Sequence, residues 1–164
     1  MSSPQLHHVS VVVHDLPAAI AFFTALGLTF EGEAPIEGEW VDRINGIDGL
    51  KVDVAMMREP DGEGRVELTA FRHPPLVAVE PAAPPPNAPG LRSLMFSVDD
   101  LDATVARLAE HGGTLIGEAV QYEDKYRLCY VRGPAGIIVA LAQPLKVART
   151  GPPRPAPGRR SHVH

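Results

Sequence analysis

The fold is decided by the stretch LHHVSVVVHDL at positions 6–16. Within it, valines at positions 9, 11 and 13 alternate with His8, Ser10 and Val12. This alternation of mostly β-branched residues predicts a strand with two different faces. Asp15 is a good residue for a helix N-cap, and Pro17 suits the first helical turn. We therefore expect the strand to run directly into a helix.

The same pattern returns later in the chain as SLMFSVDDL at positions 93–101. Asp15 then aligns with Asp100, and Gly27 aligns with Gly112, both 85 positions further on. The alignment needs no gap through the following helix and strand, where Glu33 meets Glu118. Such internal similarity is typical of a duplicated structural unit. The sequence therefore predicts two copies of one unit.

Each copy has the pattern of a strand, a helix and three further strands. In the first copy the periodicity predicts a helix over 16–26, strands over 28–33, 50–58 and 65–71, and a polar loop over 37–49. In the second copy it predicts strands over 92–98, 114–121, 126–132 and 137–142 and a helix over 100–111. We expect an α+β fold in which each sheet carries its own helix.

The domain organisation follows from the proline content. Residues 74–90 are rich in proline and predict an extended linker, because proline cannot continue a helix or a central strand. We therefore expect one domain over residues 1–147, with module one at 5–73 and module two at 91–147. Residues 148–164 are mostly Pro, Gly and Arg, and we expect this tail to be disordered.

The composition excludes several classes of protein. The chain has 164 residues, 45% of them hydrophobic, and a formal net charge of −5. Without a basic stripe we expect no nucleic-acid partner, and without a long apolar stretch we expect no membrane span. Cys129 is the only cysteine, so an internal disulfide is excluded. We expect a cytoplasmic protein.

The strand alternation also predicts a polar inner face. If the three odd-numbered valines pack under the helix, His8 and Ser10 point to the other side of the sheet. The second copy should present Ser93, Met95 and Ser97 in the same way, and the strand over 65–71 should present Glu67 and Thr69. Such a face is too polar for a dry core. It predicts the wall of a small-molecule cavity.

These features resemble the vicinal oxygen chelate superfamily, which includes glyoxalase I, bleomycin and fosfomycin resistance proteins, extradiol dioxygenases and methylmalonyl-CoA epimerase. The motifs that carry the resemblance are HVSVVVHDL at 8–16, VEL at 66–68, FSVDDL at 96–101 and RLCYVRGPAG at 127–136. The resemblance implies a glyoxalase-like fold, in which two tandem βαβββ modules form a curved, half-open mixed β-barrel with a central cleft. It is weak for the reaction, because this family is chemically diverse.

The resemblance also implies a metal position. Family members typically bind one divalent metal through four side chains, and the matching positions here are His8, Glu67, Ser93 and Ala140. Only His8 and Glu67 are good ligands, and together they suit Zn, Ni, Fe or Mn. A third ligand would have to come from nearby, for example from Glu123, Gln121 or Glu39. The alternative is a metal-free pair in which His8 is hydrogen-bonded to Glu67 as a general base or a polar wall.

Further residues are candidates for the site. Glu67 and Glu123 are the candidates for moving a proton. The side chains expected to contact a substrate are Ser10, Trp40, Thr69, Ser93, Met95, Tyr126, Arg127 and Tyr130. Arg127 should face away from Tyr126 and Tyr130, so the three side chains cannot all point inward. Trp40 could be a lid over the cavity or a plug in the core. His7 is expected to have a structural role on the helix side of the first strand or at its edge.

Two functions are consistent with these residues. The first is a metal-dependent enzyme of the glyoxalase or dioxygenase type, acting on a small oxygen-bearing molecule as an isomerase, epimerase or lyase. Ring cleavage has the least support, because a site of two histidines and one carboxylate is not visible. The alternative is a protein that binds or sequesters a small molecule without chemistry, as bleomycin resistance proteins do. Whether the chain acts as a homodimer stays open.

Overall fold

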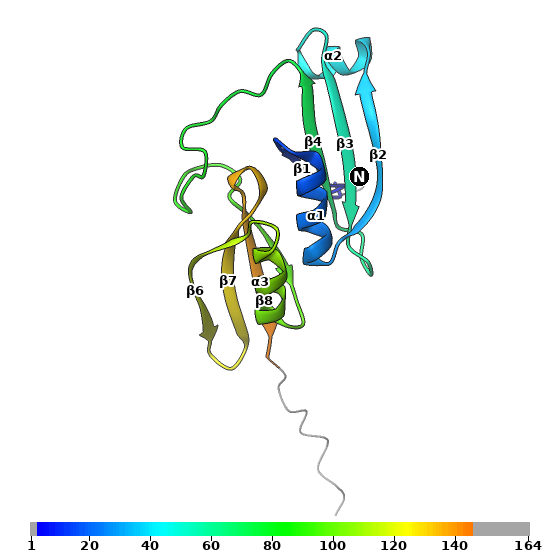
Figure 1. Cartoon of the computed structure of the whole chain (residues 1–164). Coiled ribbons are helices and arrows are strands. Elements are labelled where there is room, and N and C mark those ends of the chain that lie inside the picture. The colour runs from blue at the N-terminus through cyan, green and yellow to red at the C-terminus, as the bar shows by residue number, and fades with distance from the viewer. Residues whose placement is uncertain (1–2, 146–164) are drawn as a thin grey trace, which may run out of the picture.

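The computed structural model describes residues 3–145 and shows two modules with the same order of elements (Figure 1). The first module contains β1 (Val9–Val12), α1 (Leu16–Leu26), β2 (Thr29–Glu37), α2 (Glu39–Asn45), β3 (Lys51–Arg58) and β4 (Arg65–His73). The second contains β5 (Ser93–Ser97), α3 (Leu101–Ala109), β6 (Thr114–Tyr122), β7 (Tyr126–Arg132), the 3₁₀ turn η1 (Pro134–Gly136) and β8 (Ile138–Pro144). The tail predicted over 148–164 lies outside the described residues.

The strands form two four-stranded mixed sheets with the orders β1-β4-β3-β2 and β5-β8-β7-β6. In each sheet the first strand pairs in parallel with the last, and the remaining pairs are antiparallel. Val9 lies beside Val66, and Leu94 lies beside Val139 in the equivalent position of the second sheet. The predicted α+β fold with two βαβββ modules is confirmed.

One hydrophobic core joins the modules. Val11 and Leu68 from the first sheet, together with Phe22 and Phe23 from α1, are buried in the same cluster as Leu108 of α3. The helices α1 and α3 contact each other, and Arg107 Nε donates a hydrogen bond to the carbonyl oxygen of Ala25 at 3.0 Å. Val11 and Val13 are buried and Val9 is half-buried, which agrees with the packing predicted from the alternation.

The same residue type starts both long helices. Asp15 Oδ1 accepts a hydrogen bond from the backbone N–H of Ala18 at 3.0 Å. Asp100 Oδ1 accepts an equivalent bond from Ala103 N–H at 3.0 Å. Each carboxylate satisfies a backbone donor that has no partner within the helix. The duplicated Asp-Leu dipeptide of the sequence is therefore a duplicated cap.

The region 37–49 differs from the sequence prediction, which made it a loop. Residues 39–45 form α2, with Val41 buried and Glu39 and Asp42 in the first turn. Asp42 also accepts hydrogen bonds from the backbone N–H groups of Gly49 and Leu50 at 2.8 and 2.9 Å. The segment is short and mostly polar, so its helical face holds too few apolar residues to show a period. The remaining differences concern the ends of strands, and β1 is limited to four residues.

The proline-rich segment 74–90 contains neither helix nor strand and is fastened to the second module. Arg132 donates hydrogen bonds from one terminal nitrogen to the carbonyl oxygens of Pro84 and Gly136, at 2.8 and 2.9 Å. Gly136 has a φ of +74°, and a β-carbon there would collide with the carbonyl oxygen of Ala82. Only glycine lets the segment pass so close to this turn.

The structure also bears on the expectation about membranes. Within residues 3–145, every helix is too short or too polar to cross a bilayer.

The duplicated caps give a direct test of the fold. We expect Asp15→Ala and Asp100→Ala each to lower the free energy of unfolding by about 1 kcal/mol, because each removes one side-chain bond to a helix N-terminus. Urea denaturation of the single variants measures this. Asp99→Ala is the matched control, because Asp99 is exposed and precedes the cap. An equal loss in the control would show that the caps do not stabilise the helices.

Candidate functional site

The face of the first sheet that points away from α1 carries most of the predicted site. We call this face the inner wall and define it by the residues His8, Ser10, Val12, Arg65, Glu67, Thr69 and Phe71. It arises because β1 and β4 run in parallel with Ser10 beside Glu67 and Val12 beside Thr69. Since Val11, Val66 and Leu68 are buried under α1, the residues between them must point to the opposite side.

His8 and Glu67 meet on the inner wall. His8 Nε2 lies 3.3 Å from Glu67 Oε2, and the two side chains are 31% and 24% exposed. The other carboxylate oxygen, Oε1, accepts hydrogen bonds from Ser10 Oγ at 3.1 Å and Thr69 Oγ1 at 3.3 Å. The carboxylate is thus oriented through one oxygen and faces the imidazole with the other. A pair in this arrangement can take up or release a proton.

His7 continues this polar chain. Its Nδ1 lies 2.8 Å from Nδ1 of His8, and the two rings meet edge to face with centroids 5.0 Å apart. One of the two nitrogens must carry the hydrogen. If His8 presents a hydrogen on Nε2 to Glu67, its Nδ1 accepts from His7. His7 lies just before the start of β1 and is exposed, so it stands at the edge of the strand, and its contact with His8 is compatible with the structural role expected for it.

The four positions implied for a metal are only half filled by ligand side chains. Ser93 lies at the start of β5 and is exposed, and Ala140 is buried between Met95 and Tyr130 in the second sheet. Residues 3–145 contain no group of three or more His, Cys, Asp or Glu side chains arranged to hold a metal. The residues present therefore do not fit a closed site with four protein ligands.

Glu123 does not join His8 and Glu67. It lies in the turn between β6 and β7, where its carboxylate pairs with Lys125 at 3.2 Å. Figure 1 places this turn at the end of the second module that is remote from β1 and β4. The position of Glu123 therefore does not support the prediction that it moves a proton at the same site as Glu67.

The second sheet presents an apolar and aromatic inner face. Met95 and Tyr130 flank Ala140 in one row across β5, β8 and β7, and both side chains are exposed. Tyr126 and Ser93 are exposed as well. These four predicted contact residues thus belong to the accessible surface of the second module. The inner faces of the two modules differ, since the polar pair has no counterpart on β5 and β8.

Arg127 lies on the other side of the second sheet. Its guanidinium binds the carboxylate of Asp102 on α3 through two contacts of 2.7 and 3.1 Å. These hydrogen bonds lower the pKa of Asp102 and raise the pKa of Arg127. Arg127 is therefore engaged with a helix, away from the tyrosines, as strand parity required. Its predicted contact with substrate is not supported by this placement.

Trp40 lies in the first turn of α2, and 59% of its surface is exposed. The alternative that it plugs the core is wrong for this reason. Its side chain lies close to Gly38 at the start of α2.

Three hollows are lined by residues of the inner wall or by their neighbours, although His8 and Glu67 themselves line none of the three. One of about 540 Å³ is lined by His7, Glu31, Met56 and Arg65, among others. A second, of about 230 Å³, lies between β1 and β5 and includes Ser10, Val12, Ser93 and Ile138. A third, of about 440 Å³, lies under the proline-rich segment and is lined by Val12, Phe71, Leu76 and Val79, among others. Hollows of this size suit small molecules.

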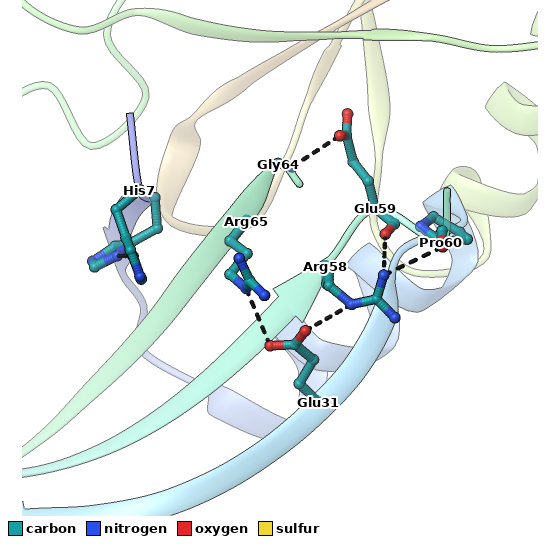
Figure 2. A network of polar contacts seen from close by, with 8 residues as sticks. His7, Glu31, Arg58, Glu59, Pro60, Gly64 and Arg65 are labelled. Carbon is teal, nitrogen blue, oxygen red and sulfur yellow. Dashed lines mark hydrogen bonds and ion pairs between the residues drawn. The ribbon is translucent and has the colours of Figure 1, made fainter. Parts of the chain in front are cut away.

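A charged cluster at one end of the inner wall escaped the sequence analysis. Figure 2 shows Glu31 between Arg58 and Arg65, with Nε–oxygen distances of 2.7 and 3.3 Å. The alternation of the strand over 65–71 does place Arg65 on the same face as Glu67, although it assigns Arg65 no role. Alternation could not place Glu31 there, since it reaches this face through an irregularity in the pairing of β2 with β3 between Phe30 and Gly32.

The sequence and the fold of this chain are similar to those of several known proteins. The model of the Glyoxalase/Bleomycin resistance protein/Dioxygenase superfamily matches residues 7–130. The uncharacterized protein YaeR of Escherichia coli K12 is 32% identical over 138 residues, which cover 84% of this chain and 94% of that protein. A glyoxalase family protein from Bacillus cereus is 46% identical, with a TM-score of 0.82 over 89% of this chain and 99% of the other.

A more distant structure shares the fold alone. TnmS3, an antibiotic binding protein from Streptomyces sp. CB03234, is 24% identical, with a TM-score of 0.54 over 88% of this chain and 98% of that one.

The Arg127–Asp102 contact predicts a pH dependence of stability. The folded pKa of Asp102 lies below its ordinary value of 3.8, so the contact stabilises the fold above that pH and loses its effect as the pH falls through the folded pKa. We expect Arg127→Met to unfold at a lower temperature than the parent at about pH 7, and the difference to shrink as the pH falls below 3.8. Arg43→Met, which changes an exposed arginine of α2, is the control for removing a positive charge. A difference that stays constant with pH would contradict the role given to the contact.

Proposed function

Because the chain belongs to the Glyoxalase/Bleomycin resistance protein/Dioxygenase superfamily, we propose that it is an enzyme that acts on a small oxygen-bearing molecule at the inner wall. The observation that supports this most is the contact between His8 Nε2 and Glu67 Oε2 at 3.3 Å. Ser10 and Thr69 hold the other oxygen of the carboxylate, so the pair is oriented before any ligand binds.

The chemistry that suits this pair is proton transfer at a carbon beside a carbonyl group. Glu67 takes the proton, and the electron pair of the broken C–H bond moves onto the carbonyl oxygen as an enolate. Return of a proton from water to the opposite face of the same carbon gives an epimer. In an α-hydroxy ketone, return of the proton to the former carbonyl carbon, with transfer of the hydroxyl proton to the enolate oxygen, gives an isomer. Loss of a leaving group instead gives a lyase reaction. His8, hydrogen-bonded to His7, stabilises the charge and shares the proton.

A divalent transition metal would have His8 and Glu67 as its protein ligands. Water and substrate oxygens would have to supply the remaining positions, because Ser93 and Ala140 cannot complete the set. Bound there, the metal would polarise a substrate oxygen. The proton transfer described above depends only on the two side chains.

A second candidate function is binding without chemistry. It is favoured by the loss of ligand side chains at positions 93 and 140 and by the exposed Met95, Tyr126 and Tyr130 on the second sheet. Flexible and aromatic side chains of this kind suit a hydrophobic small molecule. The antibiotic binding protein mentioned above shows that proteins of this fold can have such a role.

Hydrogen exchange at carbon separates the two functions. We expect the parent protein to exchange the α-protons of dihydroxyacetone or hydroxyacetone for deuterium in heavy water, followed by proton NMR. Glu67→Gln and His8→Ala should each lower the rate at least about hundredfold, because each removes half of the proton-transferring pair. Elemental analysis of each protein, expressed with added Zn, Ni, Fe or Mn, measures the metal content in parallel.

The matched controls are Glu63→Gln in the β3–β4 turn and His111→Ala after α3, both exposed. They should exchange at the parent rate. No exchange by the parent, with or without metal, would favour the binding function. Equal exchange rates in the parent and in Glu67→Gln would show that the site is wrongly assigned to Glu67.

A further inference from the structure

The charged cluster at one end of the inner wall has a surplus of positive charge. Glu31 is shared by two arginines, with Arg58 Nε at 2.7 Å from one carboxylate oxygen and Arg65 Nε at 3.3 Å from the other (Figure 2). One carboxylate cannot neutralise two guanidinium groups. Glu33, which also borders this hollow, pairs with Ala55 of β3, whose side chain is buried under α1, so its side chain belongs to the other face.

The two arginines are not equivalent. A terminal nitrogen of Arg58 donates to the carbonyl oxygens of Glu59 and Pro60 at 2.9 and 3.2 Å, so this side chain holds the β3–β4 turn. Among residues 3–145, Arg65 finds an acceptor only through Nε, and its terminal nitrogens have none. The Arg65 side chain is 32% exposed and lines the hollow of about 540 Å³ beside His7. Two free terminal nitrogens in a planar fork suit a carboxylate or a phosphate.

The position of Arg65 relates this cation to the proposed site. Arg65 and Glu67 are two residues apart on β4 and point to the same face, which separates their backbones by about 7 Å. The same hollow contains His7, whose ring contacts His8. A ligand with one oxygen at the His8–Glu67 pair therefore reaches Arg65 with an anionic group a few bonds away.

The opposite end of the inner wall is apolar. Beyond Thr69, Phe71 packs against a small buried cluster that includes Val41 of α2, and the apolar side chains of Ile36, Ile47 and Val54 pack against the same cluster. Val12 and Phe71 also line the hollow of about 440 Å³ under the proline-rich segment. Ile36 and Val54 border the Arg65 hollow as well, so the apolar surface continues between the two. Along β4 the inner wall therefore changes from the cationic Arg65, through the His8–Glu67 pair, to the apolar Phe71.

From this gradient we infer that the ligand is an anionic amphiphile. Its carboxylate or phosphate binds Arg65, an oxygen beyond it meets His8 and Glu67, and its hydrocarbon part follows Val12 and Phe71 into the hollow under residues 74–82. This inference rests on the proposed function, since it takes the His8–Glu67 pair as the centre of the site. It adds the chemical class of the ligand and the direction in which it lies.

Isothermal titration calorimetry with 5-hydroxydecanoate tests the inference, with its uncharged methyl ester and the short 5-hydroxypentanoate for comparison. The parent should bind 5-hydroxydecanoate more tightly than either. Arg65→Gln should weaken binding of the acid by about tenfold to hundredfold, the usual range for a lost hydrogen bond to a charged group, and leave the ester unchanged. Val12→Ser should weaken binding of the long acid and not that of the short one.

Arg72→Gln is the matched control, because Arg72 lies on the same strand, faces away from the inner wall and pairs with Asp53 at 3.2 Å. Circular dichroism confirms that each variant is folded. The charge-conserving Arg65→Lys, which keeps the ion pair with Glu31, should retain part of the affinity if Arg65→Gln is unstable. His8→Ala should weaken binding of both acids.

The inference is overturned if the parent does not bind 5-hydroxydecanoate, if it binds the ester equally well, or if Arg65→Gln and Arg72→Gln bind alike. The proposed function has its own test, which uses uncharged ketones and does not involve Arg65. Proton exchange without selective acid binding would therefore contradict the proposed ligand class and still support the proposed enzymatic function. If the protein neither exchanges the protons nor binds the acid selectively, the assignment of the site to the inner wall is wrong.

Discussion

The parallel pairing of β1 with β4 is the contact on which the rest of the molecule depends. It closes the first module, because β1 and β4 are joined through two helices and two further strands before they meet. One side of the pair, with Val11 and Leu68, is buried under α1. The other side brings His8 and Ser10 next to Glu67. A one-residue slip would exchange these faces and lose the core and the polar pair together.

The second module repeats this construction without repeating its chemistry. β5 pairs with β8 as β1 pairs with β4, and Asp100 caps α3 as Asp15 caps α1. In both modules one face of these strands packs into the core, with Val11 and Leu68 in the first and Val139 and Leu141 in the second. On the inner face, the positions equivalent to His8 and Glu67 hold Ser93, which is exposed, and Ala140, which is buried. The duplicated unit therefore carries a polar site in one copy and an apolar surface in the other.

The sequence predicted the residues whose role depends on local pattern. Strand parity placed His8 and Glu67 on one face and Arg127 on the other, because side chains alternate with a period of two. It failed where the structure depends on contacts between distant segments. Glu31 reaches Arg65 through an irregular pairing, and α2 is held by Asp42 binding the backbone of Gly49 and Leu50. Neither contact produces a periodic pattern of residues in the sequence.

By itself, the sequence determined the two-module α+β fold, the caps of its long helices and the two faces of β1 and β4, since all of these follow from short-range periodicity and from the repeat. The tertiary structure alone decided the rest. It set the 3.3 Å approach of His8 to Glu67, the contact of His7 with His8, and the gradient from Arg65 to Phe71. Distances between strands and the meeting of side chains from separate segments are products of packing, and packing is fixed only when the whole core has formed.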